Sequence, residues 1–183
     1  MSNGDFEPAQ AQSPVWIIGH SGHGKKTLTA AIARFLSKLA APPTGRFVEI
    51  GAAPACPANT KVAILVVSAA DGPMPQTRDH LKLAKEAGVP RVVVFMNKTD
   101  VADRDLAALI EMEMRELLNM CGFAGDKAAV IRGSAAKALA GDESELGEPS
   151  IRRLMKALGR GGPLAAEAES GGGVGGFFRR LFE

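Results

Sequence analysis

The sequence predicts an α/β protein in which helices flank a mainly parallel sheet of about five strands. Residues 61–70 (KVAILVVSAA) and 91–96 (RVVVFM) are apolar without alternation, as in strands that are covered on both faces. Such segments alternate along the chain with stretches of helical periodicity, and this order is typical of parallel sheets with right-handed crossovers. The 183 residues, of which 46% are hydrophobic, suffice for one domain with a core.

The first half of the chain begins with a short apolar stretch at 15–18 (VWII), which predicts a buried strand. Apolar residues then recur at helical spacing over 27–40, and the stretch APPTG ends this predicted helix. A short alternating strand is expected at 46–50, followed by an irregular connection over 51–60.

The second half alternates more regularly. After the strand at 61–70, an amphipathic helix is predicted with Gly88 as its stop signal. The expected elements are that helix at 77–88, a strand at 91–96, a long helix at 105–120, a strand at 128–133 and a basic-faced helix at 150–159.

The two ends of the chain differ in composition from the middle, which carries the predicted strands and helices. The predicted organisation is a disordered segment at 1–13, a domain at 14–160, a flexible glycine-rich linker at 161–176 and an aromatic-basic tail at 177–183. The net charge of +2 does not argue for nucleic acid or a membrane surface. No apolar run reaches the roughly 18 residues of a membrane span, and no signal segment is visible, so we expect a cytoplasmic protein.

A glycine-rich turn joins the first predicted strand to the first helix. Gly19, Gly24 and Lys25 fit the pattern G-x-x-x-x-G-K-[ST], in which backbone N–H groups surround a phosphate and the lysine reaches its outer oxygens. The alternative is a purely structural turn. The candidate phosphate-binding residues are Gly19, His20, Ser21, Gly22, His23, Gly24, Lys25, Lys26 and Thr27.

Two further polar turns follow predicted strands and would meet this loop at the same sheet edge. NKTD supplies Asn97, Lys98 and Asp100, and an aspartate in this pattern accepts hydrogen bonds from two ring N–H groups of guanine. The turn GSAAKAL offers backbone N–H groups at Ser134, Ala135 and Ala136. Each turn taken alone also suits a simple helix cap.

These stretches resemble the G domain of bacterial elongation factor Tu. The similarity includes GHSGHGKKTLTAAIA, AILVVSAADGPMPQTRDH, GVPRVVVFMNKTD and VIRGSAAKAL, and it extends over residues 14–160 apart from the irregular middle. The resemblance implies a three-layer P-loop NTPase or G-domain fold with GTP or GDP as ligand.

The departures from that family lie on the metal side. Lys26 stands where the family has a threonine that binds Mg²⁺, and Gly22 replaces the loop aspartate. The motif D-C-P-G-H is replaced by Gly51 and the residues after it. We therefore expect weak or absent Mg²⁺ binding and predict no catalytic residue and no metal ligand. The antiparallel edge strand of the family should be missing too.

The resulting functional prediction is a guanine-nucleotide-binding protein that hydrolyses GTP poorly and acts as a protein-interaction or regulatory module. One alternative is an active small GTPase of the translation-factor type that receives the missing groups in trans. Another is a scaffold that binds no nucleotide. The printed sequence ends before the two β-barrel domains that contact aminoacyl-tRNA in the family, so tRNA delivery is not expected.

The tail carries an apolar face next to two arginines. Phe177, Phe178, Leu181 and Phe182 follow helical spacing, which is the anchor pattern of a helix that docks in a groove. The prediction is a tethered peptide that binds a protein partner. A disordered end, a segment folded back on its own domain and a weak membrane contact are the alternatives.

Overall fold

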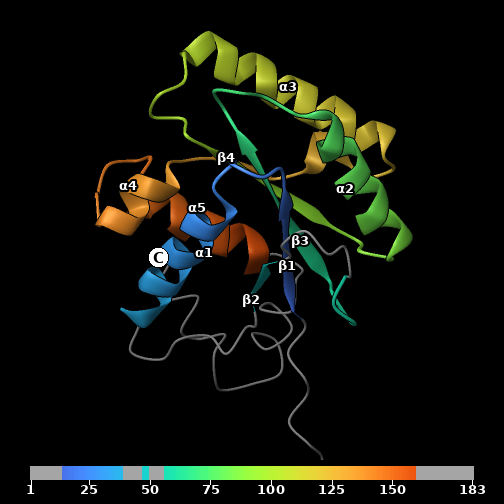
Figure 1. Cartoon of the computed structure of the whole chain (residues 1–183), viewed down its shortest axis with the longest axis horizontal. Coiled ribbons are helices and arrows are strands. Elements are labelled where there is room, and N and C mark those ends of the chain that lie inside the picture. Colours follow the sequence, from blue (N-terminus) through green and yellow to red (C-terminus); the bar gives the residue numbers. More distant parts are fainter. Residues whose placement is uncertain (1–13, 39–46, 50–55, 160–183) are drawn as a thin grey trace, which may run out of the picture.

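The computed structural model describes residues 14–38, 47–49 and 56–159. In this part of the chain a five-stranded parallel sheet has the strand order β2-β1-β3-β4-β5 (Figure 1). The strands are β1 (Val15–Gly19), β2 (Phe47–Glu49), β3 (Val62–Ser68), β4 (Val92–Asn97) and β5 (Val130–Arg132). The α-helices are α1 (Lys25–Ser37), α2 (Pro75–Glu86), α3 (Arg104–Met120), α4 (Ala135–Ala140) and α5 (Glu148–Gly159). The predicted α/β class is confirmed.

The helices form two layers, one on each face of the sheet (Figure 1). Helices α1, α4 and α5 pack on one face, and α2 and α3 pack on the other. Strand β1 illustrates why the interior strands are mainly apolar on both faces. Val15 and Ile17 point into the first layer while Trp16 points into the second, and all three are buried. Successive side chains of a strand point to opposite faces, so both sets must be apolar.

Some element boundaries differ from the sequence-based expectation. Helix α1 begins at Lys25 rather than at residue 27, because Gly24 takes a left-handed conformation with φ 91° and turns the chain directly into the helix. Helix α2 begins at Pro75 rather than at 77, since a proline suits the first turn of a helix. Gly88 follows this helix with φ 76°, as its predicted stop signal.

Other differences concern short elements. Helix α5 begins at Glu148, whose charge suits a helix N-terminus, rather than at residue 150. The six-residue helix α4 and the 3-10 turn Gly125–Lys127 were not predicted, because such short elements contain too few turns for a periodic pattern. Strand β4 also includes Asn97, so the NKTD motif starts inside the sheet rather than after it.

Several predictions fall outside the described residues. These are the disordered segment 1–13, the linker 161–176, the tail 177–183 and the missing antiparallel strand, which would lie within 39–46 or 50–55. Within the described part, β2 is the edge strand next to β1. In that same part, no helix combines the length and the apolar character that crossing a membrane requires.

Candidate nucleotide-binding site

The carboxyl ends of four strands meet at one edge of the sheet. β1 ends at Gly19, β3 at Ser68, β4 at Asn97 and β5 at Arg132. Because ligands of open parallel sheets bind outside this edge, the turns that follow these strands form the candidate site. All the predicted site residues of the described chain lie in or beside these turns.

The glycine-rich loop follows β1 and runs into α1. The Lys25 ammonium donates to the carbonyl oxygens of Gly19 at 2.7 Å and His20 at 3.1 Å, so the side chain folds back over its own loop. Gly19 allows β1 to lie close to β3, because a Cβ atom there would be 2.4 Å from the Val66 oxygen. The loop thus places the lysine and the first amides of α1 at one point, as an anion site requires.

Asn97 connects the three predicted turns. Its Nδ2 donates to the His23 oxygen in the glycine loop at 2.8 Å. Its Oδ1 accepts from the Ala135 N–H at 2.8 Å. The Asn97 side chain is 4% exposed, and a buried amide with both ends bonded holds its neighbours at fixed positions. Asn97 therefore joins the glycine loop, NKTD and the serine-alanine turn in one hydrogen-bonded frame.

Gly24 permits this connection. A Cβ atom at Gly24 would lie 2.2 Å from Asn97 Nδ2, and the left-handed conformation also favours glycine. The second glycine of the motif is therefore required by the close approach of the asparagine as well as by the turn.

The remaining residues of NKTD lie at the surface. Lys98 has a left-handed conformation with φ 60°, and its ammonium is 3.6 Å from the Asp71 carboxylate. Thr99 is held by a bond from its N–H to the Gly133 oxygen at 3.2 Å. Asp100 is exposed, and no hydrogen bond or ion pair of its carboxylate occurs within the described residues. Its carboxylate can thus face a ligand.

The serine-alanine turn caps α4. Ser134 Oγ accepts from the Lys137 N–H at 3.3 Å, and the Ser134 N–H donates to the Leu146 oxygen at 2.7 Å. The Ala135 N–H already donates to Asn97, so this N–H holds the asparagine in place. Ala136 is exposed at the start of α4.

Sequence reasoning assigned no role to the stretch that follows β3. Ser68 is fully buried, and its Oγ accepts from the N–H groups of Ala70 and Asp71 at 3.3 Å each. A hydrogen bond from Ser68 lowers the pKa of Asp71, and the charge of Lys98 adds to this. Asp71 lies within AILVVSAADGPMPQTRDH, which resembles the elongation factor Tu G domain. That resemblance is the signal that could have drawn attention to Asp71.

Two histidines near the loop are held neutral. Burial lowers the pKa of His23, and the neighbouring His20, 5.0 Å away between ring centroids, adds to this. Burial also lowers the pKa of His80 in α2, with a further contribution from the positive charge of Lys25. In each ring Nδ1 is buried without a hydrogen-bond partner among the described residues. The lowered pKa values favour the neutral form of these two rings.

The residues at the loop do not fit a magnesium site. Mg²⁺ requires oxygen ligands, most often carboxylates. The loop carries no carboxylate, an exposed ammonium stands at position 26, and the Asp71 carboxylate is paired with Lys98. No group of three or more histidine, cysteine, aspartate or glutamate side chains suited to a metal ion occurs in the described ranges. Residues 50–55, where the family's second metal-side motif would lie, are outside them.

Comparison with known families identifies the family of the domain. The model of the family described as "Elongation factor Tu GTP binding domain" matches residues 55–161, more than half of the chain. The matched range includes NKTD and the serine-alanine turn, and it begins after the glycine loop. The family expectation drawn from the sequence is confirmed. The chain is a G domain and belongs to the family of the elongation factor Tu GTP-binding domain.

Proposed function

We propose that this chain binds GTP and GDP with little dependence on Mg²⁺, hydrolyses GTP poorly by itself, and acts as a protein-interaction module. The observation that carries the proposal is the Asn97 side chain, which bonds to the glycine loop and to Ala135 at 2.8 Å each. The frame that holds a guanine nucleotide is complete, while the metal side differs from the family.

The phosphate side supports nucleotide binding. Lys25 lies over the loop, and its present acceptors are backbone carbonyl oxygens, which phosphate oxygens can replace with a stronger, charge-assisted bond. The N–H groups at the start of α1 and the helix dipole add a favourable field for an anion.

The guanine side supports discrimination between bases. The exposed Asp100 carboxylate would accept two N–H groups of guanine, which adenine does not offer. Lys98 is positioned for stacking its stem along a base, because its left-handed backbone and its ion pair with Asp71 hold it at the surface of the turn. Asn97, Lys98 and Asp100 are therefore proposed as the guanine contacts, together with the turn at Ser134, Ala135 and Ala136.

The metal side supports weak hydrolysis. Phosphoryl transfer relies on Mg²⁺ at the outer phosphates and on an oriented water molecule. In place of the hydroxyl ligand, Lys26 supplies a single positive charge next to that of Lys25. Such a fixed charge favours bound phosphate in the ground state without organising the chemistry, which suits a binding protein more than an enzyme.

A titration of nucleotides tests the proposal. GDP, GTP and ADP are titrated into the full chain by calorimetry, in Mg²⁺ and in excess chelator. We expect GDP to bind at least about 100-fold more tightly than ADP. Removal of Mg²⁺ should change the GDP affinity by less than about threefold, because Lys26 stands in place of the hydroxyl ligand that would couple the metal to the loop. Equal affinities for ADP and GDP would exclude the guanine site.

The variant Lys26→Thr tests the metal side. It restores the hydroxyl at the position of the family ligand, so GTP binding should become sensitive to chelator. Hydrolysis should stay poor, because the residues after Glu49 do not supply the other metal-side groups. Lys82→Thr, an exposed lysine of α2, is the matched control. Sustained GTP turnover by the parent chain alone at about 1 s⁻¹ or faster, the range of ordinary enzymes, contradicts the proposal.

A further inference from the structure

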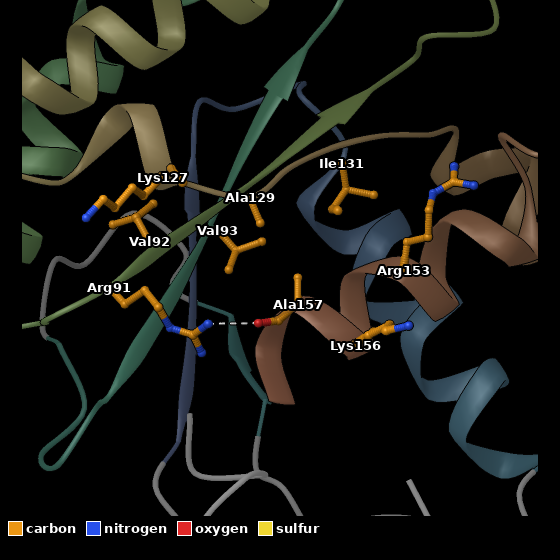
Figure 2. A pocket seen from close by; sticks show the side chains of 10 residues that line it. Arg91, Val92, Val93, Lys127, Ala129, Ile131, Arg153, Lys156 and Ala157 are labelled. Carbon is orange, nitrogen blue, oxygen red and sulfur yellow. Dashed lines mark hydrogen bonds between the residues drawn. The ribbon is translucent and has the colours of Figure 1, made fainter. Parts of the chain in front are cut away.

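A cavity of about 550 Å³ opens at the edge of the sheet opposite to the nucleotide site. It lies between the amino ends of β4 and β5 and the last turns of α5 (Figure 2). Its apolar lining consists of Val92, Val93, Ala128, Ala129, Ile131 and Ala157. Small-molecule sites in proteins have volumes of roughly 300–1,000 Å³ and are mostly apolar, so the cavity has the size and lining of such a site.

Every charged residue that lines the cavity is a cation. These are Arg91, Lys127, Arg153 and Lys156. In Figure 2 the apolar side chains of Val93 and Ile131 lie between Arg91 on one side and α5 on the other. The ion pairs of the described residues do not include Arg91, Lys127 or Arg153. The cavity is therefore an apolar hollow with positive charge around it.

Among the described residues, the hydrogen-bond partners of the Arg91 guanidinium are neutral groups. Its two terminal nitrogens donate to the Ala157 and Leu158 oxygens at 2.8 Å each. Its Nε is buried and has no hydrogen-bond partner among the described residues. Burial lowers the pKa of this guanidinium, which shows that its charge is partly removed from water. An anion near a partly desolvated cation is attracted more strongly than one in bulk solvent.

Arg153 is held in place at the rim by backbone groups as well. One of its terminal nitrogens donates to the Glu145 oxygen at 2.7 Å and to the Arg132 oxygen at 3.3 Å. Its positive charge is thus fixed in position without being neutralised. A guanidinium has five N–H donors, so both arginines retain donors beyond these bonds.

We propose that this cavity binds a small amphipathic anion, in which a carboxylate or phosphate monoester is joined to a compact apolar body. The apolar body would cover the floor between β4, β5 and α5, and the anionic group would lie at the rim among the cations. A neutral apolar ligand makes no use of the cations at the rim, and an inorganic anion leaves the floor in water.

Calorimetric titration of the full chain at constant ionic strength tests this. Four probes are compared below their aggregation concentrations: octyl phosphate, octanoate, octanol and inorganic phosphate. Octyl phosphate and octanoate distinguish the two anionic groups, and we expect at least one of them to bind at least about tenfold more tightly than octanol and than inorganic phosphate. Amide chemical shifts should change at Val92, Val93 and Ala129.

Substitutions at the rim locate the site. The double variant Arg153→Gln/Lys156→Gln should weaken binding by about fivefold or more, since two nearby charges are lost. Arg152→Gln is the matched control, because Arg152 is an exposed neighbour on α5 that does not line the cavity. Ala129→Phe should abolish binding by filling the floor, with thermal unfolding as the check that each variant folds.

Three results overturn the proposal. One is octanol binding as tightly as the two anions, which would indicate a purely apolar surface. Another is inorganic phosphate binding as tightly as octyl phosphate, which would indicate a surface anion contact only. The third is the absence of binding of either amphipathic anion to the full chain. Because the rim variants remove only exposed charges, the test does not depend on whether Ala129→Phe folds.

Discussion

At the scale of single residues, the site separates into groups that hold the frame and groups that face a ligand. Asn97 is buried with both ends of its amide bonded, whereas Asp100, three residues later, is exposed. Two residues of one motif therefore have opposite physical roles. Changing the first should affect folding and binding together, and changing the second should affect binding alone.

Asp100→Asn tests the second role. If the carboxylate accepts two charge-assisted hydrogen bonds from guanine, each worth about 1.5–3 kcal/mol, GDP affinity should fall by at least about 100-fold. The thermal unfolding temperature without nucleotide should stay the same. Asp105→Asn, an exposed carboxylate in the first turn of α3, serves as the control and should bind GDP like the parent. A loss below about tenfold contradicts the assignment.

The pH dependence of stability follows from the neutral histidines. The pKa of His23 is lowered in the folded state, so the unfolded chain, with a value near 6.5, takes up protons more readily as the pH falls. This contribution to stability is present above about pH 6.5 and is lost as the pH falls towards the folded pKa. Urea unfolding should thus give a lower free energy at pH 5.5 than at pH 7.5.

Histidine variants test which side chains cause this pH dependence of stability. His23→Gln should reduce the difference between the two pH values, and His23→Gln/His80→Gln should reduce it further, because the pKa of His80 is lowered as well. If the single variant keeps the full pH dependence of the parent, the neutral His23 is not its source.

At the scale of elements, β3 and β4 were predicted well because their side chains are apolar on both faces of the sheet. β3 lies inside the stretch 61–70, β4 covers 92–96 of the stretch 91–96 and adds Asn97, and the two strands pair in parallel as expected. The six-residue α4 was missed because it completes too few turns to show periodicity. The Ser134 N–H also donates to the Leu146 oxygen across a loop, a contact that local pattern does not encode.

The candidate site was predicted in its composition but not in its connections. The glycine loop, NKTD and the serine-alanine turn are each visible in the sequence. The bond from Asn97 to the His23 oxygen joins residues 74 positions apart, and the pairing of Lys98 with Asp71 is also non-local. Such contacts depend on strand order. The cavity beside Arg91 was not predicted for the same reason, because its lining comes from separate elements.

The junction between the glycine loop and β4 gives a prediction at this scale. Gly24→Ala introduces a Cβ atom 2.2 Å from Asn97 Nδ2, which should displace the amide and break its bond to His23. Gly22→Ala is the matched control, because Gly22 also has a positive φ of 85° but has no atom within 4 Å of the added Cβ.

Both variants place an alanine at a positive φ, but only Gly24→Ala brings a Cβ atom against Asn97. Each should lose about 1 kcal/mol for an alanine in the left-handed region. Gly24→Ala should lose about 1–3 kcal/mol more, since it leaves buried polar groups without partners. Urea unfolding measures both losses, and GDP affinity should fall further for Gly24→Ala than for Gly22→Ala. Equal destabilisation of the two variants contradicts the proposed role of this contact.

At the scale of the whole molecule, the described part is a single three-layer domain, and the proposed partner-binding tail lies outside it. If Phe178 and Phe182 are the anchors of a docking peptide, a chain that ends after Ser170 should lose a protein partner that the full chain retains in a pull-down. Phe178→Ser/Phe182→Ser should lose the same partner, and Val174→Ser, in the linker, should keep it. Identical partners for all four proteins would end this hypothesis.

The bonds from Arg91 to the last carbonyl groups of α5 also have a mechanical consequence. Helix α5 is the last described element before the C-terminal segment, so tension applied to that segment reaches Ala157 and Leu158 first. Arg91 transmits it to the amino end of β4, an interior strand between β3 and β5. The opposite end of β4 carries Asn97 and with it the nucleotide frame. If a partner pulled on the tail while a nucleotide occupied the proposed site, the two would act on opposite ends of one strand.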